Sequence, residues 1–214
     1  MAEYKNVAVC DLRNISVESA KQIEGIINVA LVVMPKDASE ELKAALAAIP
    51  QKNVATTVYM SKEGNMGLKN GLTIITDADF APGQENYLIC NGIVVFQKKL
   101  QQNCGITMGT LNGMRAYLDF EECHQFAGKV TVDKDMLDLL EAKTLAVAAK
   151  KIVIAPDVTV EQLKEKKPCF VAGEKIACSK ETAAYVKVNS YVGEKIEVYS
   201  GEEWDDEDDG DWDD

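Results

Sequence analysis

Arginine and histidine are scarce in this 214-residue sequence, which contains only Arg13, Arg115 and His124 of these two types. Nucleic-acid binding depends on neutralising phosphates with basic side chains, and arginine makes most of the bidentate phosphate contacts. The formal net charge of the chain is -12. We therefore expect no nucleic-acid partner.

Long hydrophobic runs and clustered cysteines are also missing. No run of about eighteen apolar residues occurs, so we expect no membrane-spanning helix. The first residues, MAEYKNVAVCDLRN, lack the basic region and apolar core of a secretory signal. The cysteines are spread thinly, and we expect reduced, mostly buried thiols in a cytoplasmic protein. They are Cys10, Cys90, Cys104, Cys123, Cys169 and Cys178.

Recognisable motifs for catalysis, nucleotide binding and metal binding are absent. His124 has no nucleophile motif nearby, which favours a structural histidine over a general base. The cysteines form no close pair of the kind that zinc sites use. The stretch KEGNMG at 62–67 lacks the Gly-Lys-Ser/Thr end of a phosphate loop. Asp77 and Asp79 are interpreted as acids of a surface turn, so the sequence predicts no catalytic residue, cofactor or metal.

Three Asn-Gly dipeptides recur at one interval. Their asparagines are Asn70, Asn91 and Asn112, and each dipeptide precedes an apolar, strand-like run. A sustained period of about 20–50 residues indicates a repeat architecture. Asparagine and glycine tolerate the positive φ that sharp corners need, and stacked asparagines can hydrogen-bond along a ladder. We interpret the three asparagines as a structural ladder at the corner that leads into each strand.

The same period continues on both sides of these dipeptides. The N-terminal part repeats Asn-Val-Ala at Asn6, Asn28 and Asn53. Across the chain, the first apolar residues of ten strand-like runs follow one another at a mean interval of 21 residues. We expect coils that stack in parallel, with right-handed crossings. The ten residues are Val7, Val29, Val54, Leu72, Ile93, Met114, Val130, Ile152, Ile176 and Ile196.

Short helices are predicted between strands in the outer thirds of the chain. Ser39 and Thr159 are placed to cap helices within two similar segments that begin at Pro35 and Pro156. Nine of the fourteen glycines lie between positions 64 and 128, where helical patterning is poor. The predicted fold is a β-solenoid with short helices (an α/β repeat). It forms one domain over residues 1–200, with coils of about 21 residues, an all-β middle and helical turns toward both ends.

One alternative remains open for the dipeptides. Asn-Gly between apolar runs is also the strongest short signal for a β-hairpin, and YLICNGIVVF fits a hairpin in a compact mixed domain. The period and the strand-plus-helix units resemble leucine-rich repeats. In that family, however, the asparagine follows the strand within a framework of leucines, whereas here it precedes the strand. The six-residue steps of hexapeptide acyltransferases are also absent, so no family is assigned.

Residues 201–214 form an acidic C-terminal tail. The last thirteen residues hold ten carboxylates and no base, and the remaining chain has 25 acidic and 23 basic residues. Both tryptophans, Trp204 and Trp212, lie in this tail. They are candidate partner-binding residues, with acidic charge steering two aromatic anchors toward a basic, grooved protein. A disordered acidic segment is the alternative. The stretch DDEDDG begins like a calcium loop but ends before its twelfth ligand position.

These observations favour a noncatalytic scaffold or protein-interaction module. Solenoids present long regular surfaces that suit protein partners, and their ends provide a route to homo-oligomers. The alternative is an enzyme, carbohydrate-active or of another class, that uses carboxylates on one solenoid face. Such enzymes need no linear motif, so the absence of a catalytic motif does not exclude them.

Overall fold

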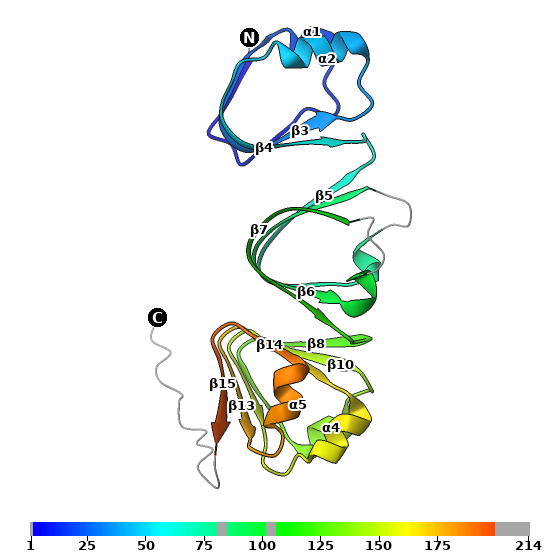
Figure 1. Cartoon of the computed structure of the whole chain (residues 1–214), viewed down its shortest axis with the longest axis vertical. Helices are drawn as coiled ribbons and strands as arrows, with labels where there is room; N and C mark the ends of the chain where they lie inside the picture. The colour runs from blue at the N-terminus through cyan, green and yellow to red at the C-terminus, as the bar shows by residue number, and fades with distance from the viewer. Residues whose placement is uncertain (1, 81–84, 102–105, 200–214) are drawn as a thin grey trace. The chain divides into compact units, whose positions relative to one another are not determined.

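The computed structural model describes residues 2–80, 85–101 and 106–199, and within 106–112 it describes the backbone alone. The described chain divides into two compact units. The first comprises residues 2–67, 85–87 and 106–107. The second comprises residues 68–80, 88–101 and 108–199. Each unit is built from parallel strands with a few short helices or helical turns (Figure 1).

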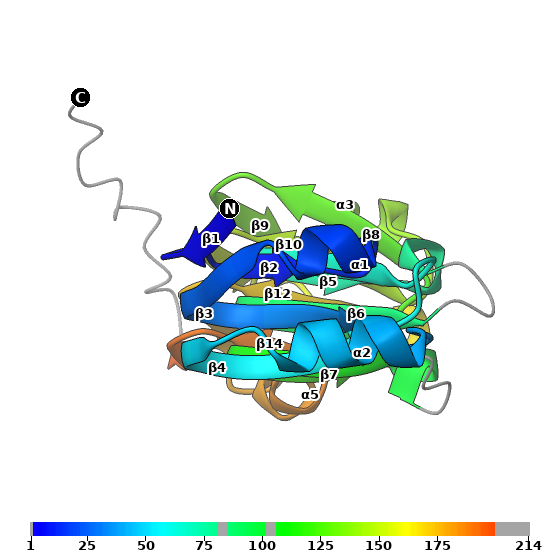
Figure 2. The same cartoon turned by 90° about the horizontal axis from the view of Figure 1, so that it is seen from above.

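A four-stranded sheet and two helices make up most of the first unit. In chain order these are β1 (Ala2–Lys5), β2 (Val9–Asp11), α1 (Val17–Ala20), β3 (Ile23–Pro35), α2 (Glu40–Ala47) and β4 (Gln51–Met60). Strands β1 and β2 pair one after the other with the two halves of β3, and β4 pairs with its other edge (Figure 2). All three pairings are parallel. Tyr4 lies opposite Ile26, and Val29 lies opposite Val54.

The two helices of the first unit start where polar caps predict. Ser39 accepts a hydrogen bond from the Leu42 amide, as expected from the sequence, and Ser16 caps the shorter helix in the same way. The apolar faces of the helices cover the concave side of the sheet, where Leu46 packs in one cluster with Ile26. The helices therefore close a small core on one side of the sheet.

Three long strands, whose first two or three residues belong to the first unit, bend sharply without ending. The strands β5 (Asn65–Ile75), β6 (Asn86–Gln97) and β7 (Ile106–Leu118) form a sheet in that order, with 3-10 turns η1 (Asp77–Asp79) and η2 (Lys98–Gln101). The three strands are strongly curved (Figure 1), and Gly71, Gly92 and Gly113, which have positive φ, lie inside them. The Asn-Gly corners thus lie inside the strands. The expectation that strands begin after them is wrong, because a glycine at positive φ bends a strand without breaking its pairing.

Two four-stranded parallel sheets complete the second unit. Strands β8 (Glu122–Phe126), β10 (Thr144–Ala148), β12 (Cys169–Ala172) and β14 (Ser190–Val192) form one sheet. Strands β9 (Lys129–Val132), β11 (Lys151–Ile154), β13 (Lys175–Ser179) and β15 (Lys195–Tyr199) form the other. Helices α3 (Lys134–Leu139), α4 (Val160–Lys166) and α5 (Ala183–Val188) connect successive pairs of strands.

The register of the sheet β9–β11–β13–β15 agrees with the predicted strand spacing. Ile152 lies opposite both Val130 and Ile176, and Ile176 lies opposite Ile196. The cap at Thr159 is also as predicted, and it forms a reciprocal capping box with Gln162. Each turn of chain here contributes two strands, however, so β8, β10, β12 and β14 add a layer that the ten predicted strand starts omit.

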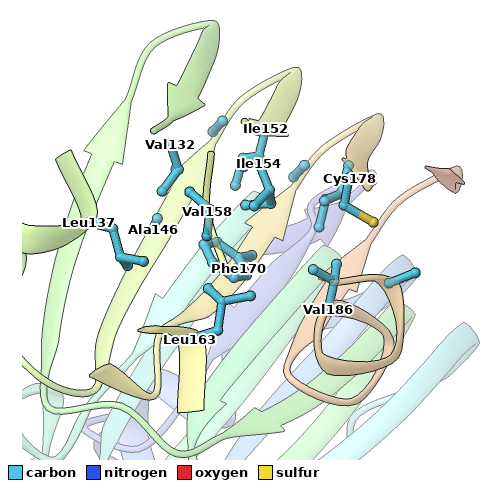
Figure 3. Packing of buried hydrophobic residues seen from close by; sticks show 14 residues of the cluster. Val132, Leu137, Ala146, Ile152, Ile154, Val158, Leu163, Phe170, Cys178 and Val186 are labelled. Carbon is cyan, nitrogen blue, oxygen red and sulfur yellow. The ribbon is translucent and has the colours of Figure 1, made fainter. Parts of the chain in front are cut away.

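Two hydrophobic clusters hold these sheets together. Inside the turns of chain, Ile152 and Phe170 pack with Leu163 of α4 (Figure 3). On the opposite face of β10 and β12, Leu145 and Val171 pack with Val95 of the bent sheet. Strands buried on both faces read as nearly continuous apolar runs, as in TLAVA and CFVA.

The fold is thus mostly parallel strands in several sheets, with few and short helices. The sequence predicts an all-β middle. In this region, the described segments that follow β5 and β6 are short 3-10 turns and not α-helices. Among the described residues, no helix is long and apolar enough to cross a membrane.

Candidate functional site

The predicted asparagine ladder lies on the bends of β5 and β6. Asn91 Nδ2 donates a hydrogen bond of 2.9 Å to Asn70 Oδ1. Asn65 donates to Asn86 with the same offset along the chain, at 3.4 Å, so β5 and β6 run parallel and not as a hairpin. The side chain of Asn112, the third predicted member, lies outside the described residues. This part of the ladder is a structural element at the surface.

A second asparagine ladder lies in the first unit, where sequence reasoning noted the repeat but predicted no ladder. Asn28 Nδ2 donates to Asn6 Oδ1 at 2.8 Å, and Asn53 Nδ2 donates to Asn28 Oδ1 at 2.9 Å. All three asparagines have φ between 54° and 56°. Asparagine tolerates this left-handed conformation better than most residues, so one side chain permits the bend and also links neighbouring strands.

Arg13, one of the two arginines, holds a charged contact within the first unit. Its guanidinium forms an ion pair of 2.7 Å with Asp11, and Nη1 also donates to the Gly64 carbonyl. The arginine side chain is 11% exposed and the aspartate side chain is 34% exposed, so the pair is only partly shielded from water. The hydrogen bond from Arg13 lowers the pKa of Asp11. The contact ties the end of β2 to the chain beyond β4 and is structural in character.

A hollow of about 580 Å³ in the second unit gathers opposite charges. Asp77 pairs with Lys99 at 2.6 Å, and Lys143 pairs with Glu121 at 3.3 Å and with Asp119 at 3.4 Å. The hydrogen bond from Lys99 lowers the pKa of Asp77. Its carboxylate is therefore held ionised, which suits an ion pair and not a general acid at neutral pH.

A buried polar side chain, that of Gln97, lines this hollow and forms hydrogen bonds within the chain. Gln97, which is 4% exposed, donates to the Phe120 carbonyl at 2.9 Å and accepts from the Asp77 amide at 3.3 Å. One buried side chain thus joins three successive segments of the chain. Asp79, the other acid considered from the sequence, caps the η1 turn through Thr76.

A column of four lysines crosses the sheet β9–β11–β13–β15. Lys151 lies opposite both Lys129 and Lys175, and Lys175 lies opposite Lys195. The residue after each lysine, as in Ile152 and Ile176, faces the core, so the lysines project from the outer face. We call these four residues the lysine column. Sequence reasoning missed it, although a lysine precedes each of the four predicted strand starts in this region.

Among the remaining candidates for chemistry, Cys123 and Cys169 belong to one hydrophobic cluster. His124 lies exposed on β8, opposite Ala146. Burial raises the pKa of the Cys169 thiol to about 11, which keeps it protonated and poorly nucleophilic. Among the described residues, no group of three or more His, Cys, Asp and Glu side chains could hold a metal ion. Trp204, Trp212 and Cys104 lie outside the described residues.

Comparison with known proteins adds no relative to these observations. No family model, no curated protein and no solved structure matches the chain.

Proposed function

We propose that this chain is a noncatalytic scaffold whose parallel coils form a solenoid, and that the coil ends bind protein partners, including further copies of the chain. Repeat folds of this kind bury a continuous core by stacking, and each end needs a cap to complete it. The proposal covers residues 1–200 as the scaffold, with residues 201–214 as an acidic appendage.

The edges of the sheets carry this proposal. Strands β14 and β15 are the last of their sheets, and within the described residues no strand pairs with their outer sides. The opposite edges, β8 and β9, are terminal in the same sense. An edge strand presents backbone donors and acceptors that another strand can satisfy, which is the basis of recognition by strand addition.

Apolar side chains that pack against the interior are also only partly covered at these edges. Phe126 and Val130 are half-buried at the β8–β9 end, and Val192 and Ile196 are half-buried at the β14–β15 end. In the first unit, a hollow of about 660 Å³ borders β1 and β2 and is lined in part by Tyr4 and Ile15. A partner that added a strand at such an end would bury apolar surface as well as pair backbone groups.

The charged hollow supports the scaffold over the carbohydrate-active alternative. A glycoside hydrolase needs one carboxylic acid whose pKa is raised so that it can donate a proton. In the hollow, the carboxylates of Asp77, Asp119 and Glu121 all have lysine partners. The lowered pKa of Asp77 runs opposite to that requirement.

The test removes one backbone donor from the outer edge. The Lys195 amide donates to Glu174 on the β13 side at 3.2 Å. Because amides alternate sides along a strand, the Val198 amide points away from β13. Val198→Pro removes that donor at an edge position, where proline is tolerated, and Val198→Ala is the matched control that keeps it.

Sedimentation velocity across a concentration series at high salt provides the measurement. The natural chain and Val198→Ala should sediment faster as concentration rises, whereas Val198→Pro should remain monomeric with an unchanged circular dichroism spectrum. If the natural chain stays monomeric throughout, or if the proline variant associates equally, binding through this edge is wrong.

A further inference from the structure

The lysine column places like charges close together. Neighbouring parallel strands lie about 4.8 Å apart, so four ammonium groups rise from a width of about 14 Å. Like charges directly opposite each other on a sheet are destabilising. Glu197 contributes one carboxylate, which pairs with Lys175 at 3.0 Å and with Lys195 at 3.5 Å. Both of these lysines lie toward the β15 end of the column.

The surroundings of the column remain positive overall. The turns and strands that bear it hold five lysines and three glutamates, a net charge of +2. Two of the glutamates, Glu174 and Glu194, lie in the turns that lead into β13 and β15, and Glu197 lies on β15. These eight residues are Lys129, Lys150, Lys151, Glu174, Lys175, Glu194, Lys195 and Glu197.

The described part of the chain ends on this same sheet. Tyr199, the last residue of β15, donates a hydrogen bond from its hydroxyl to the Ile154 carbonyl at the end of β11. The side chain thus reaches across β13 and holds the end of β15 against the sheet that bears the lysines. Beyond it lie residues 200–214, which could span about 50 Å if fully extended.

We propose that residues 202–214 bind the lysine column of their own chain. The segment has ten carboxylates and no base, so it is complementary to a positive surface. Its reach exceeds the length of β15, about 13 Å for five residues, so it can return along the sheet. Tryptophan faces attract ammonium groups, so Trp204 and Trp212 add contacts that a purely acidic segment lacks. This inference is independent of the proposed scaffold function.

Intrinsic fluorescence tests the proposal directly, because both tryptophans of the protein lie in this segment. In the full chain at low salt, indole emission should be protected from acrylamide quenching and its anisotropy should be high. The quenching constant should rise by about twofold on going from about 0.02 M to about 0.5 M salt, because the Debye length shortens.

Two sets of substitutions separate the column from general charge. Replacing the four lysines of the column with glutamine should give the high-salt quenching value already at low salt. Replacing Lys5, Lys21, Lys43 and Lys52 of the first unit with glutamine changes the net charge by the same amount. This control should leave the quenching constant at low salt unchanged. Circular dichroism checks folding of both variants, and the salt titration of the natural chain stands if either variant fails to fold.

Three results would overturn the proposal. The first is quenching in the natural chain that does not change with salt. The second is equal quenching in the two substituted chains. The third is protection that grows with protein concentration, because this would place the segment on a second copy and not on its own lysine column.

Discussion

Asn28 accepts a hydrogen bond from Asn53 at 2.9 Å and donates one to Asn6 at 2.8 Å, all from left-handed backbone. A single residue type therefore supplies both the bend of each strand and the link to the next strand. Asn91 and Asn70 make the same link in the second unit, where the following glycines, Gly71 and Gly92, take the positive φ.

Removing the middle of the ladder should destabilise the first unit. Asn28→Ala removes both side-chain hydrogen bonds and places alanine, which has no side-chain amide, at a strained positive φ. We expect the free energy of unfolding to fall by about 1–3 kcal/mol. Asn28→Gly loses the bonds but relieves the backbone, so it should cost less. Urea denaturation of the three proteins measures both contributions. Equal stability of all three would mean that the ladder contributes nothing.

The bend at Gly92 should not accept a branched side chain. Its φ is 124°, and an ideal Cβ would lie 2.5 Å from the Gly71 carbonyl oxygen. We expect Gly92→Val to lower the free energy of unfolding by about 1–3 kcal/mol. Gly128→Ala is the control, since its Cβ would meet no atom within 4 Å, and it should change stability by less than about 0.5 kcal/mol. A denaturant titration that finds both variants alike would contradict the assigned backbone.

The spacing of apolar residues predicted parallel strands with short helices, and the limits of that prediction have physical causes. Val130, Ile152, Ile176 and Ile196 lie in register because a stacked sheet repeats its inward positions at the coil length. The same spacing could not place the bends within β5 and β6. An Asn-Gly pair indicates positive φ, but the sequence is the same whether the pair precedes a strand or bends it in the middle.

The candidate surfaces were less accessible from sequence. Arg13 meets Gly64 across 51 positions, and no local pattern encodes such a contact. The lysine column, in contrast, follows the period already noted, since each lysine precedes a predicted strand start. A search for charged residues in phase with the apolar repeat would have identified it. Gln97 gave no signal, because its importance comes from burial alone.

The contact between Asp11 and Arg13 should make stability depend on pH. The pKa of Asp11 is lowered in the folded protein, so the folded state binds this proton less readily than the unfolded state does. The stabilisation is therefore complete above the unfolded value of about 3.9 and is lost as pH falls through the folded pKa.

A comparison of variants measures this dependence. The free energy of unfolding of the natural chain minus that of Asp11→Asn should be largest near neutral pH and should shrink below about pH 4. Asp37→Asn, at an exposed position in the same unit, is the control. A difference for Asp11→Asn that stays constant across this range would show that the charge of Asp11 is not what Arg13 stabilises.

The acidic tail should regulate association through the coil ends. Charge beside an edge strand discourages edge-to-edge pairing, and residues 202–214 follow directly after β15 and the short linker that ends at Gly201. Deleting these residues removes no residue of the described core and only an exposed charge contact with the lysine column, so it should lower the melting temperature only slightly. The deletion should promote self-association at low salt.

Light scattering of the intact and the truncated protein across a salt series tests the account most directly. We predict that the truncated protein associates already at low salt and that the intact protein associates more as salt rises, because screening weakens the repulsion between tails. A truncated protein that stays monomeric at every salt concentration while its melting temperature drops sharply would contradict the account, because the tail would then be part of the folded body and the coil ends would not bind one another.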